Sequence, residues 1–403
     1  MSCCISILPE HILQSIFFKL PIATLVRCRY VCKSWRHILA DPNFAKLHGR
    51  FANLLLFVDR KGLSSRLSRC RNLYFLEPEG GSIDYGKSLA TVFSWSSELS
   101  SVFSVENSCK GLLCLRRNNI DGLTDGIWIL NPLTGEYIIL PPHEDDQIRQ
   151  YFYRCGLGFC PNTNLYKVIK MFHTRHDKTM NAEVYTLGTD EWRKIGVVPQ
   201  YNAPRRDNLR SFTNAPCRYN WSLTNASVNG SIHWLIMDMN GPRIRPIQMC
   251  AFDFEIEKFR SFGLPPIFQG DDYCWTEIGV VRESLCISCR NRFRLQVTEI
   301  WLMKEYGVEG SWTKMLVLDF RIDYFDSLDF RVVELLENGN VLLKRGYMTL
   351  FLYNPETKVL VKMNNGRTQI PIPAAVVSKP SFACLEDVVG DSSRVLKGFV
   401  WDH

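Results

Sequence analysis

The chain has 403 residues, of which 46% are hydrophobic and 22% are charged. These proportions are close to those of ordinary globular proteins, and they exclude a wholly disordered chain, a collagen and a coiled coil. No apolar stretch approaches the ~18 residues of a membrane span, and the N-terminal residues lack the pattern of a secretory signal. We therefore expect no membrane partner, reduced cysteines, and a location in the nucleus or the cytoplasm.

Positive charge is concentrated at the N-terminal end of the chain. The first 50 residues hold seven basic and two acidic side chains, a net charge of +5, whereas the whole chain carries +7. The rest of the chain is therefore almost neutral. This distribution favours a small basic module with an acidic partner over a nucleic-acid-binding protein.

Residues 8–39 predict three short helices. Pro9 and Glu10 suit a first helical turn, and Pro21 ends that helix. A wide apolar stripe follows the first turn, formed by Ile12, Leu13, Ile16, Phe17 and Leu20. Three short helices barely close a core of their own, so the surplus of large apolar side chains indicates either an interface with another protein or packing onto the rest of this chain.

From about residue 51, short strands alternate with turns. A hairpin whose flanking apolar residues are seven positions apart occurs four times, at Leu130…Tyr137, Tyr185…Trp192, Phe252…Phe259 and Tyr353…Leu360. Leu76…Ile83 and Trp301…Trp312 are looser copies. The hairpins recur about every 55 residues, which predicts an all-β propeller of about six four-stranded blades, with an irregular β-sandwich as the alternative. Residues 381–389 are expected to form a strand that completes the blade begun near residues 53–57.

Three sequence motifs in the helical segment resemble the F-box, which docks on a Skp-type adaptor in SCF ubiquitin ligases. They are Leu8-Pro9, Leu20-Pro21 and the run from Val31 to Arg36. The resemblance implies that one set of residues contacts the adaptor or builds the three-helix core: Leu8, Pro9, Ile16, Leu20, Pro21, Leu25, Val31, Cys32 and Trp35. Phe18 departs from the polar residue that is common in the motif, and we expect it to face the downstream domain.

Further motifs extend the resemblance along the chain. Cys-Lys-Gly-Leu-Leu-Cys at 109–114, Asn-Pro-Leu-Thr-Gly-Glu at 131–136 and Gly-Leu-Gly-Phe at 156–159 are similar to those of plant F-box proteins with a kelch-like, F-box-associated domain. The expected organisation is α+β and multidomain, with an F-box at 1–48 and a propeller-like recognition domain at 49–403.

The resemblance implies a non-catalytic receptor. It would link a Skp-type adaptor, and through it a cullin–RING E3 ubiquitin ligase, to an unknown target protein for ubiquitination and proteasomal degradation. The alternative is a non-degradative F-box scaffold whose propeller binds a small ligand or a glycan. A propeller hydrolase stays open, although no motif indicates one.

Candidate chemical motifs favour structural roles. Cys286 and Cys289 form a lone C-x-x-C, and residues three apart in a strand point to opposite faces, so they are expected to be core cysteines rather than zinc ligands. His173 and His176 lie in a polar stretch that reads as a solvated loop, and His233 reads as a half-buried strand residue. We expect no catalytic residue, metal or cofactor.

One interval of the repeat is longer than the others. Between Trp192 and Phe259 there are about 12 extra residues, which fall within 199–221. Long loops on a propeller often carry the binding function, and arginine and aromatic side chains anchor interfaces. The predicted target-binding residues are Arg205, Arg206, Arg210, Tyr219 and Trp221. The alternative is a solvated insertion with no role.

Overall fold

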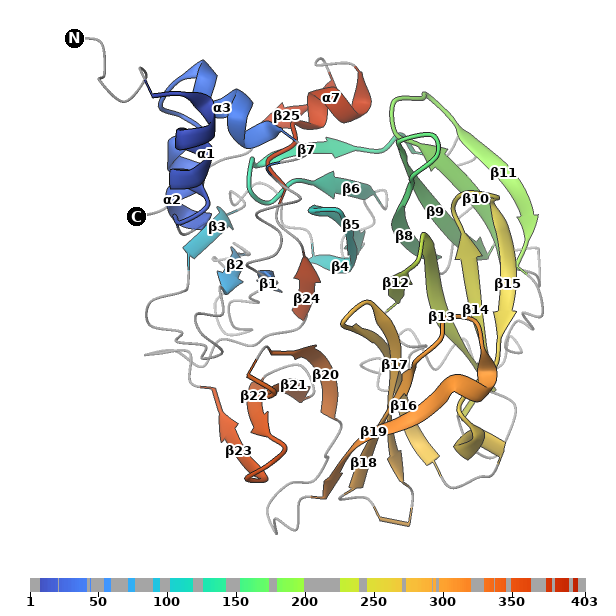
Figure 1. The fold of residues 1–403 in the computed structure, drawn as a ribbon. Helices are drawn as coiled ribbons and strands as arrows, with labels where there is room; N and C mark the ends of the chain where they lie inside the picture. The colour runs from blue at the N-terminus through green and yellow to red at the C-terminus, as the bar shows by residue number, and fades with distance from the viewer. Residues whose placement is uncertain are drawn as a thin grey trace, which may run out of the picture.

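The structure is a computed structural model that describes residues 8–20, 22–41, 44, 54–58, 72–76, 90–94, 102–118, 126–142, 153–173, 180–198, 225–238, 245–269, 273–291, 293–294, 297–319, 330–336, 338–345, 349–363, 375–378, 381–390 and 394–397. All contacts given below are between these residues. Figure 1 shows three N-terminal helices beside a ring of β-sheets.

The N-terminal helices are α1 (Glu10–Phe17), α2 (Ile22–Cys28) and α3 (Lys33–Ala40). Pro9 precedes α1 with φ −56°, and its carbonyl accepts hydrogen bonds from the N–H groups of Ile12 and Leu13. Proline suits this position because its missing N–H has no helical partner there. Helix α3 ends before Asp41, whose extended backbone is typical of a residue that precedes a proline.

The strands described here form six sheets, each given in its hydrogen-bonded order. The first contains β24 (Ala375–Ser378), β1 (Leu54–Val58), β2 (Asn72–Leu76) and β3 (Ala90–Ser94). The second contains β4 (Val102–Cys109), β5 (Leu112–Asn118), β6 (Ile127–Leu130), β7 (Glu136–Ile139) and β25 (Leu396–Lys397). The third contains β8 (Tyr153–Cys160), β9 (Leu165–His173), β10 (Met180–Thr186) and β11 (Trp192–Val197).

The other three sheets each have four strands. The fourth contains β12 (Ala226–Val228), β13 (Ser231–Asp238), β14 (Arg245–Asp253) and β15 (Lys258–Phe262). The fifth contains β16 (Tyr273–Val281), β17 (Ser284–Asn291), β18 (Val297–Met303) and β19 (Trp312–Asp319). The sixth contains β20 (Phe330–Leu335), β21 (Val341–Arg345), β22 (Thr349–Asn354) and β23 (Val359–Lys362).

The six sheets are the blades of a propeller. Their first strands, β4, β8, β12, β16, β20 and β24, lie around the centre of the ring, where β24 contacts both β20 and β4. The all-β propeller of about six blades is therefore confirmed. Five blades have the expected four strands, and the blade that begins with β4 has a fifth because β25 pairs with β7.

The ring closes through the C-terminal part of the chain, but not through the segment expected. Strand β24 pairs antiparallel with β1, from Leu54 opposite Ser378 to Phe57 opposite Ala375. The prediction of a strand at 381–389 is wrong, because residues Leu385–Val389 form helix α7. Gly390 ends α7 in the left-handed conformation, with φ 74°, which glycine adopts without strain.

The repeated hairpins are the outer strand pairs of the blades. Each predicted pair of apolar residues lies directly opposite across its hairpin: Leu130 and Tyr137, Tyr185 and Trp192, Phe252 and Phe259, Tyr353 and Leu360. The looser copy differs, because Trp312 lies opposite Met303 rather than Trp301. Ile83 lies outside the described residues.

Side-chain acceptors fix three of these outer turns. The Oδ1 atoms of Asn131, Asp253 and Asn354 each accept hydrogen bonds from the backbone N–H groups two and three residues later. An Asn or Asp side chain that bonds its own backbone in this way favours a turn over a continued strand. The recurrence of this residue type therefore explains the regular hairpins.

Candidate functional site

Helix α1 presents two adjacent apolar rows. Leu13 and Phe17 point inward and are 3% and 1% exposed. Ile12 and Ile16, four residues apart on the neighbouring side of α1, are 39% and 42% exposed, and Leu8, which precedes the helix, is 37% exposed; these three residues are here called the α1 outer row. The helix needs only its inner row to pack on the rest of this chain, so the outer row is surface available to another molecule.

A second exposed apolar pair lies between α2 and α3. Tyr30 is 64% exposed and Val31 is 57% exposed. Three cations of the helical segment are also exposed, namely Lys19, Arg27 and Lys33. Exposed apolar and basic side chains in one small module fit a partner that is apolar in part and acidic.

Aromatic side chains join α1 to α3 and the end of α1 to Phe44 beneath this surface. The ring of Phe17 meets that of Trp35 edge to face, with centroids 5.0 Å apart. Phe18 stacks on Phe44 at 4.8 Å. Such pairs add to the apolar burial of a core, so they help to fix α1 relative to α3.

The structure divides the predicted adaptor residues into two groups. Leu8, Pro9, Ile16 and Val31 are exposed, whereas Leu20, Cys32 and Trp35 are half-buried. Leu25 has no exposed surface, so it is a core residue and not a contact residue. Pro21 lies outside the described residues. Ile12 and Tyr30, which were not singled out as contacts, belong to the exposed apolar surface; the position of Ile12 four residues before Ile16 was the signal for it.

The helices share their core with the propeller. Leu13, Phe17, Leu25 and Leu39 from the helices pack in one cluster with propeller side chains. These are Leu113, Leu115, Trp128, Leu130, Leu133 and Phe382. Part of the apolar surplus therefore packs onto the downstream domain, as one of the two alternatives predicted. Another part faces outward, and its contact with another protein stays a prediction. Phe18 also packs against this shared cluster, consistent with the expectation for it.

Two family models match the chain. Residues 5–47 match the F-box domain, and residues 86–378 match the F-box associated beta propeller domain. The chain belongs to the F-box-associated β-propeller family. Residues 8–41 and 44 thus belong to an F-box domain, and such a domain implies binding to a Skp-type adaptor.

Relatives of this F-box protein are found in Arabidopsis thaliana. The F-box protein At3g07870 is 28% identical over 387 residues, which cover 87% of this chain and 85% of the relative. The putative F-box protein At3g23260 is 26% identical, with 79% of this chain and 82% of the relative covered. The chain also aligns with a solved prolyl endopeptidase over 91% of its own length and 53% of that protein's, at 7% identity and a TM-score of 0.36.

The F-box protein's candidate chemical motifs have structural surroundings. Cys286 and Cys289 are buried in β17, and the thiol of Cys289 donates to the carbonyl oxygen of Glu299. His233 is fully buried rather than half-buried. Among the residues that the structure describes, no three His, Cys, Asp or Glu side chains gather as a metal site, and no helix has the length and apolar character to cross a membrane.

The predicted target-binding residues of the propeller lie outside the described residues. They are Arg205, Arg206, Arg210, Tyr219 and Trp221, and His176 lies outside as well. The described residue before this segment is Val198 and the one after it is Asn225. Their contribution to binding stays a prediction.

Proposed function

We propose that this protein is the substrate-recognition subunit of an SCF-type cullin–RING E3 ubiquitin ligase. In this role it carries out no chemistry itself. It binds a Skp-type adaptor through the F-box domain and a target protein through the propeller, which raises the local concentration of target lysines near the ubiquitin-loaded enzyme. Location in the nucleus or the cytoplasm is part of this proposal, because ubiquitin ligases of this type work there.

The α1 outer row is the observation that carries the proposal. Leu8, Ile12 and Ile16 are each more than a third exposed, although the same helix buries Leu13 and Phe17 almost completely. Isolated exposed apolar residues need no explanation, but two on one side of a short helix and a third just before its start form a docking stripe. The exposed cations Lys19, Arg27 and Lys33 would complement an acidic adaptor.

Co-purification from plant cells treated with a proteasome inhibitor tests the proposal. Adaptor, cullin and RING subunits should accompany the tagged wild-type chain. They should be lost from the I12S/I16S variant, since serine removes the apolar contact from exposed positions without disturbing the core. The matched control is V359S/V361S, which changes two valines on β23 that are 51% and 53% exposed.

The subunits that are captured also distinguish a ligase receptor from a non-degradative scaffold. Capture of the adaptor without cullin or RING subunits would overturn the ligase proposal and favour the non-degradative F-box scaffold. Equal capture by wild type and by I12S/I16S would show that the α1 outer row is not the docking stripe.

A further inference from the structure

A buried ion pair joins the F-box domain to the propeller. Arg29 directly follows α2, and its Nη2 lies 3.1 Å from Oε1 of Glu136 at the start of β7. The two side chains are only 4% and 3% exposed. A charge buried this deeply is costly without its partner, so each of these residues depends on the position of the other domain.

The Glu136 carboxylate also holds the C-terminal part of the chain. Its Oε2 accepts the backbone N–H of Leu385, the first residue of α7, at 2.8 Å. The Sγ of Cys384 lies 3.1 Å from the same Nη2 of Arg29 and 3.4 Å from Nη2 of Arg36. Three parts of the chain, distant in sequence, therefore meet at one carboxylate.

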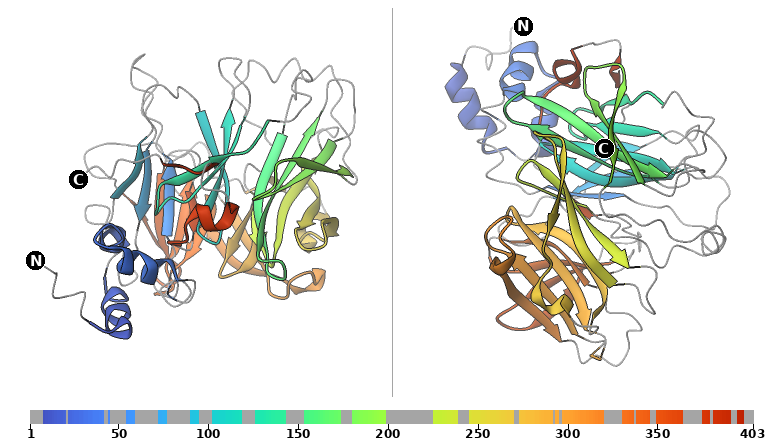
Figure 2. Two further views of the ribbon diagram at one scale, coloured as in Figure 1. Left: turned by 90° about the horizontal axis from the view of Figure 1, so that it is seen from above. Right: turned by 90° about the vertical axis from the view of Figure 1, so that its right-hand side faces the viewer.

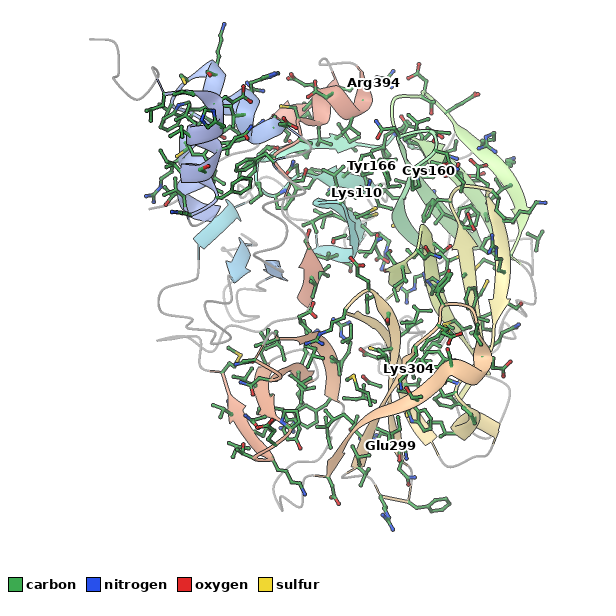
Figure 3. The ribbon with its side chains drawn as sticks, in the orientation of Figure 1. Lys110, Cys160, Tyr166, Glu299, Lys304 and Arg394 are labelled. Atoms are coloured by element: carbon green, nitrogen blue, oxygen red, sulfur yellow. The ribbon has the colours of Figure 1, made fainter. Side chains whose placement is uncertain are left out.

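Residues 381–390 and 394–397, here called the C-terminal strap, are bound along the propeller. The Nδ2 of Asn131 donates to the carbonyl oxygens of Ser381 and Ala383, at 3.0 and 2.8 Å. Further along, Leu396 pairs with Tyr137, and Arg394 forms an ion pair with Asp190 of the next blade. In Figure 3 Arg394 lies beside α7, above the two blades that the strap connects.

Apolar contacts reinforce the same arrangement. Phe382 is 2% exposed and packs in the cluster that F-box and propeller share. Leu385 and Val389 of α7 pack in the neighbouring cluster, with Leu187 of the adjacent blade. Figure 2 shows α7 and the three N-terminal helices on the same face of the ring. The strap therefore lies between the F-box domain and two blades.

We infer that Arg29 and Glu136 are positioning residues of the ligase, which together with the C-terminal strap fix the orientation of the F-box domain on the propeller. The shared apolar cluster brings the domains together, but apolar attraction has no preferred direction. A buried, hydrogen-bonded ion pair has one favourable geometry, so it selects one orientation. This inference rests on the proposed function, in which a fixed orientation holds a target at a set distance from the ubiquitin-loaded enzyme.

The test variant removes the charges of the ion pair while keeping side chains of similar size. In the R29M/E136Q variant both charges are lost, methionine fills the space of the arginine stem, and the glutamine oxygen still accepts the N–H of Leu385. The control is Arg260→Met, which breaks a surface ion pair with Asp253 inside one blade. Both variants are compared with wild type as full chains in complex with a Skp-type adaptor.

The readout is the distance distribution between two genetically encoded spin labels, at the exposed His37 in the F-box domain and at Lys304 in the propeller. Lys304 lies on the side of the ring away from the N-terminal helices (Figure 3). Wild type and Arg260→Met should give one narrow distribution, and R29M/E136Q a broad one, with adaptor affinity within about twofold of wild type. A role confined to stability would leave the distribution of the folded variant narrow.

A reconstituted ligase gives a second readout on the same variants, with the lysines of the propeller itself as ubiquitin acceptors. R29M/E136Q should spread ubiquitin over more of these lysines than wild type. A narrow distribution and an unchanged lysine pattern would overturn the inference and leave the proposed function intact, whereas failure of wild type to bind the adaptor would overturn the proposed function instead. If R29M/E136Q does not fold, Glu136→Gln alone replaces it, because it removes the ion pair while its amide oxygen still accepts the N–H of Leu385; a distribution as narrow as that of wild type then overturns the inference in the same way.

Discussion

Arg29 and Glu136, 107 positions apart in the sequence, form a buried ion pair 3.1 Å long between the F-box domain and the propeller. Replacing Arg29 by alanine leaves the Glu136 carboxylate buried and uncompensated, which should lower the free energy of unfolding by about 3–5 kcal/mol. Urea denaturation of the purified adaptor complex measures this. The control Arg260→Ala should cost about 1 kcal/mol or less, because Arg260 is half exposed in its pair with Asp253. Equal costs for the two variants would contradict the prediction.

Leu8 and Pro9 should matter for binding more than for folding. Leu8 is 37% exposed, and Pro9 accepts the first hydrogen bonds of α1. The L8A/P9A variant should weaken adaptor binding by about 2–4 kcal/mol, as for other apolar anchors of interfaces. Ile139→Ala is the control, because Ile139 is 48% exposed on the propeller. Binding of L8A/P9A at wild-type strength, measured by calorimetry, would count against an adaptor surface here.

Gly158 lies at a close approach between two blades. A Cβ atom added there would overlap the ring of Phe254, which is 1% exposed. The carbonyl of Phe254 accepts hydrogen bonds from Cys160 and Lys167, so the ring has little freedom to move away. Gly158→Ala should therefore lower stability by about 1–3 kcal/mol through overpacking.

The matched control for Gly158→Ala is Gly310→Ala. A Cβ atom at 310 would meet nothing within 4 Å. Its melting temperature should equal or slightly exceed that of wild type, since alanine reduces the entropy of the unfolded chain. A Gly158→Ala variant as stable as Gly310→Ala would show that the two blades separate easily.

His233 should make stability depend on pH. Its Nδ1 donates to the carbonyl of Ala226 at 2.9 Å, its Nε2 accepts from the Tyr306 hydroxyl at 3.0 Å, and burial lowers the pKa of His233 to about 4. The unfolded chain binds this proton near pH 6.5, whereas the folded chain binds it only near pH 4. The stabilising effect is therefore complete above about pH 6.5 and is lost as the pH falls towards 4, a change of about 3 kcal/mol.

Comparison with His233→Gln isolates this effect from the other titrating groups. Between pH 7 and pH 4, the unfolding free energy of wild type should fall by about 3 kcal/mol more than that of the variant. Parallel pH profiles for the two proteins would contradict the prediction, because they would mean that His233 binds its proton at the same pH in the folded and the unfolded chain.

The propeller could be predicted from the sequence because its signal is local. Pairs such as Leu130 and Tyr137 enclose a turn whose Asn131 side chain bonds its own backbone, so seven residues suffice to specify each hairpin. The sequence signal for the F-box helices is equally local, since Pro9 marks the start of one helix and Asp41, the residue before Pro42, marks the end of another. In both cases the short-range pattern and the final structure agree.

The joint between the domains could not be predicted, because its signal is not local. Nothing near Arg29 in the sequence indicates that its partner is Glu136. Phe382, Val388 and Val389 are residue types that favour strands, yet Leu385–Val389 form α7, where the Glu136 carboxylate accepts the N–H of Leu385 and Gly390 ends the helix. Tertiary contacts therefore decide the structure of this segment, and it is these contacts that hold the F-box domain.

The described residues before 199–221 show where on the propeller the chain enters this segment. The turn that joins β10 to β11 contacts Arg394 of the C-terminal strap through Thr189 and Asp190. The strap and the F-box helices share that face of the ring (Figure 2). Strand β11 runs away from the turn, so Val198 lies towards the opposite face. Val198, the last residue described before 199–221, therefore lies away from the face that the strap and the F-box helices share.

Arg205, Arg206 and Arg210 should accordingly serve target binding and not adaptor binding. Guanidinium groups bind carboxylates or phosphates through paired hydrogen bonds, so we expect an acidic or phosphorylated target segment. The triple alanine variant should keep adaptor affinity within about twofold but capture fewer proteins in proximity labelling under proteasome inhibition, and raising salt should weaken wild-type capture. The control replaces three exposed lysines elsewhere, Lys304, Lys358 and Lys362, with the same change in net charge. Unchanged capture by the arginine variant, or an equal loss in the lysine control, would assign target recognition to another part of the propeller.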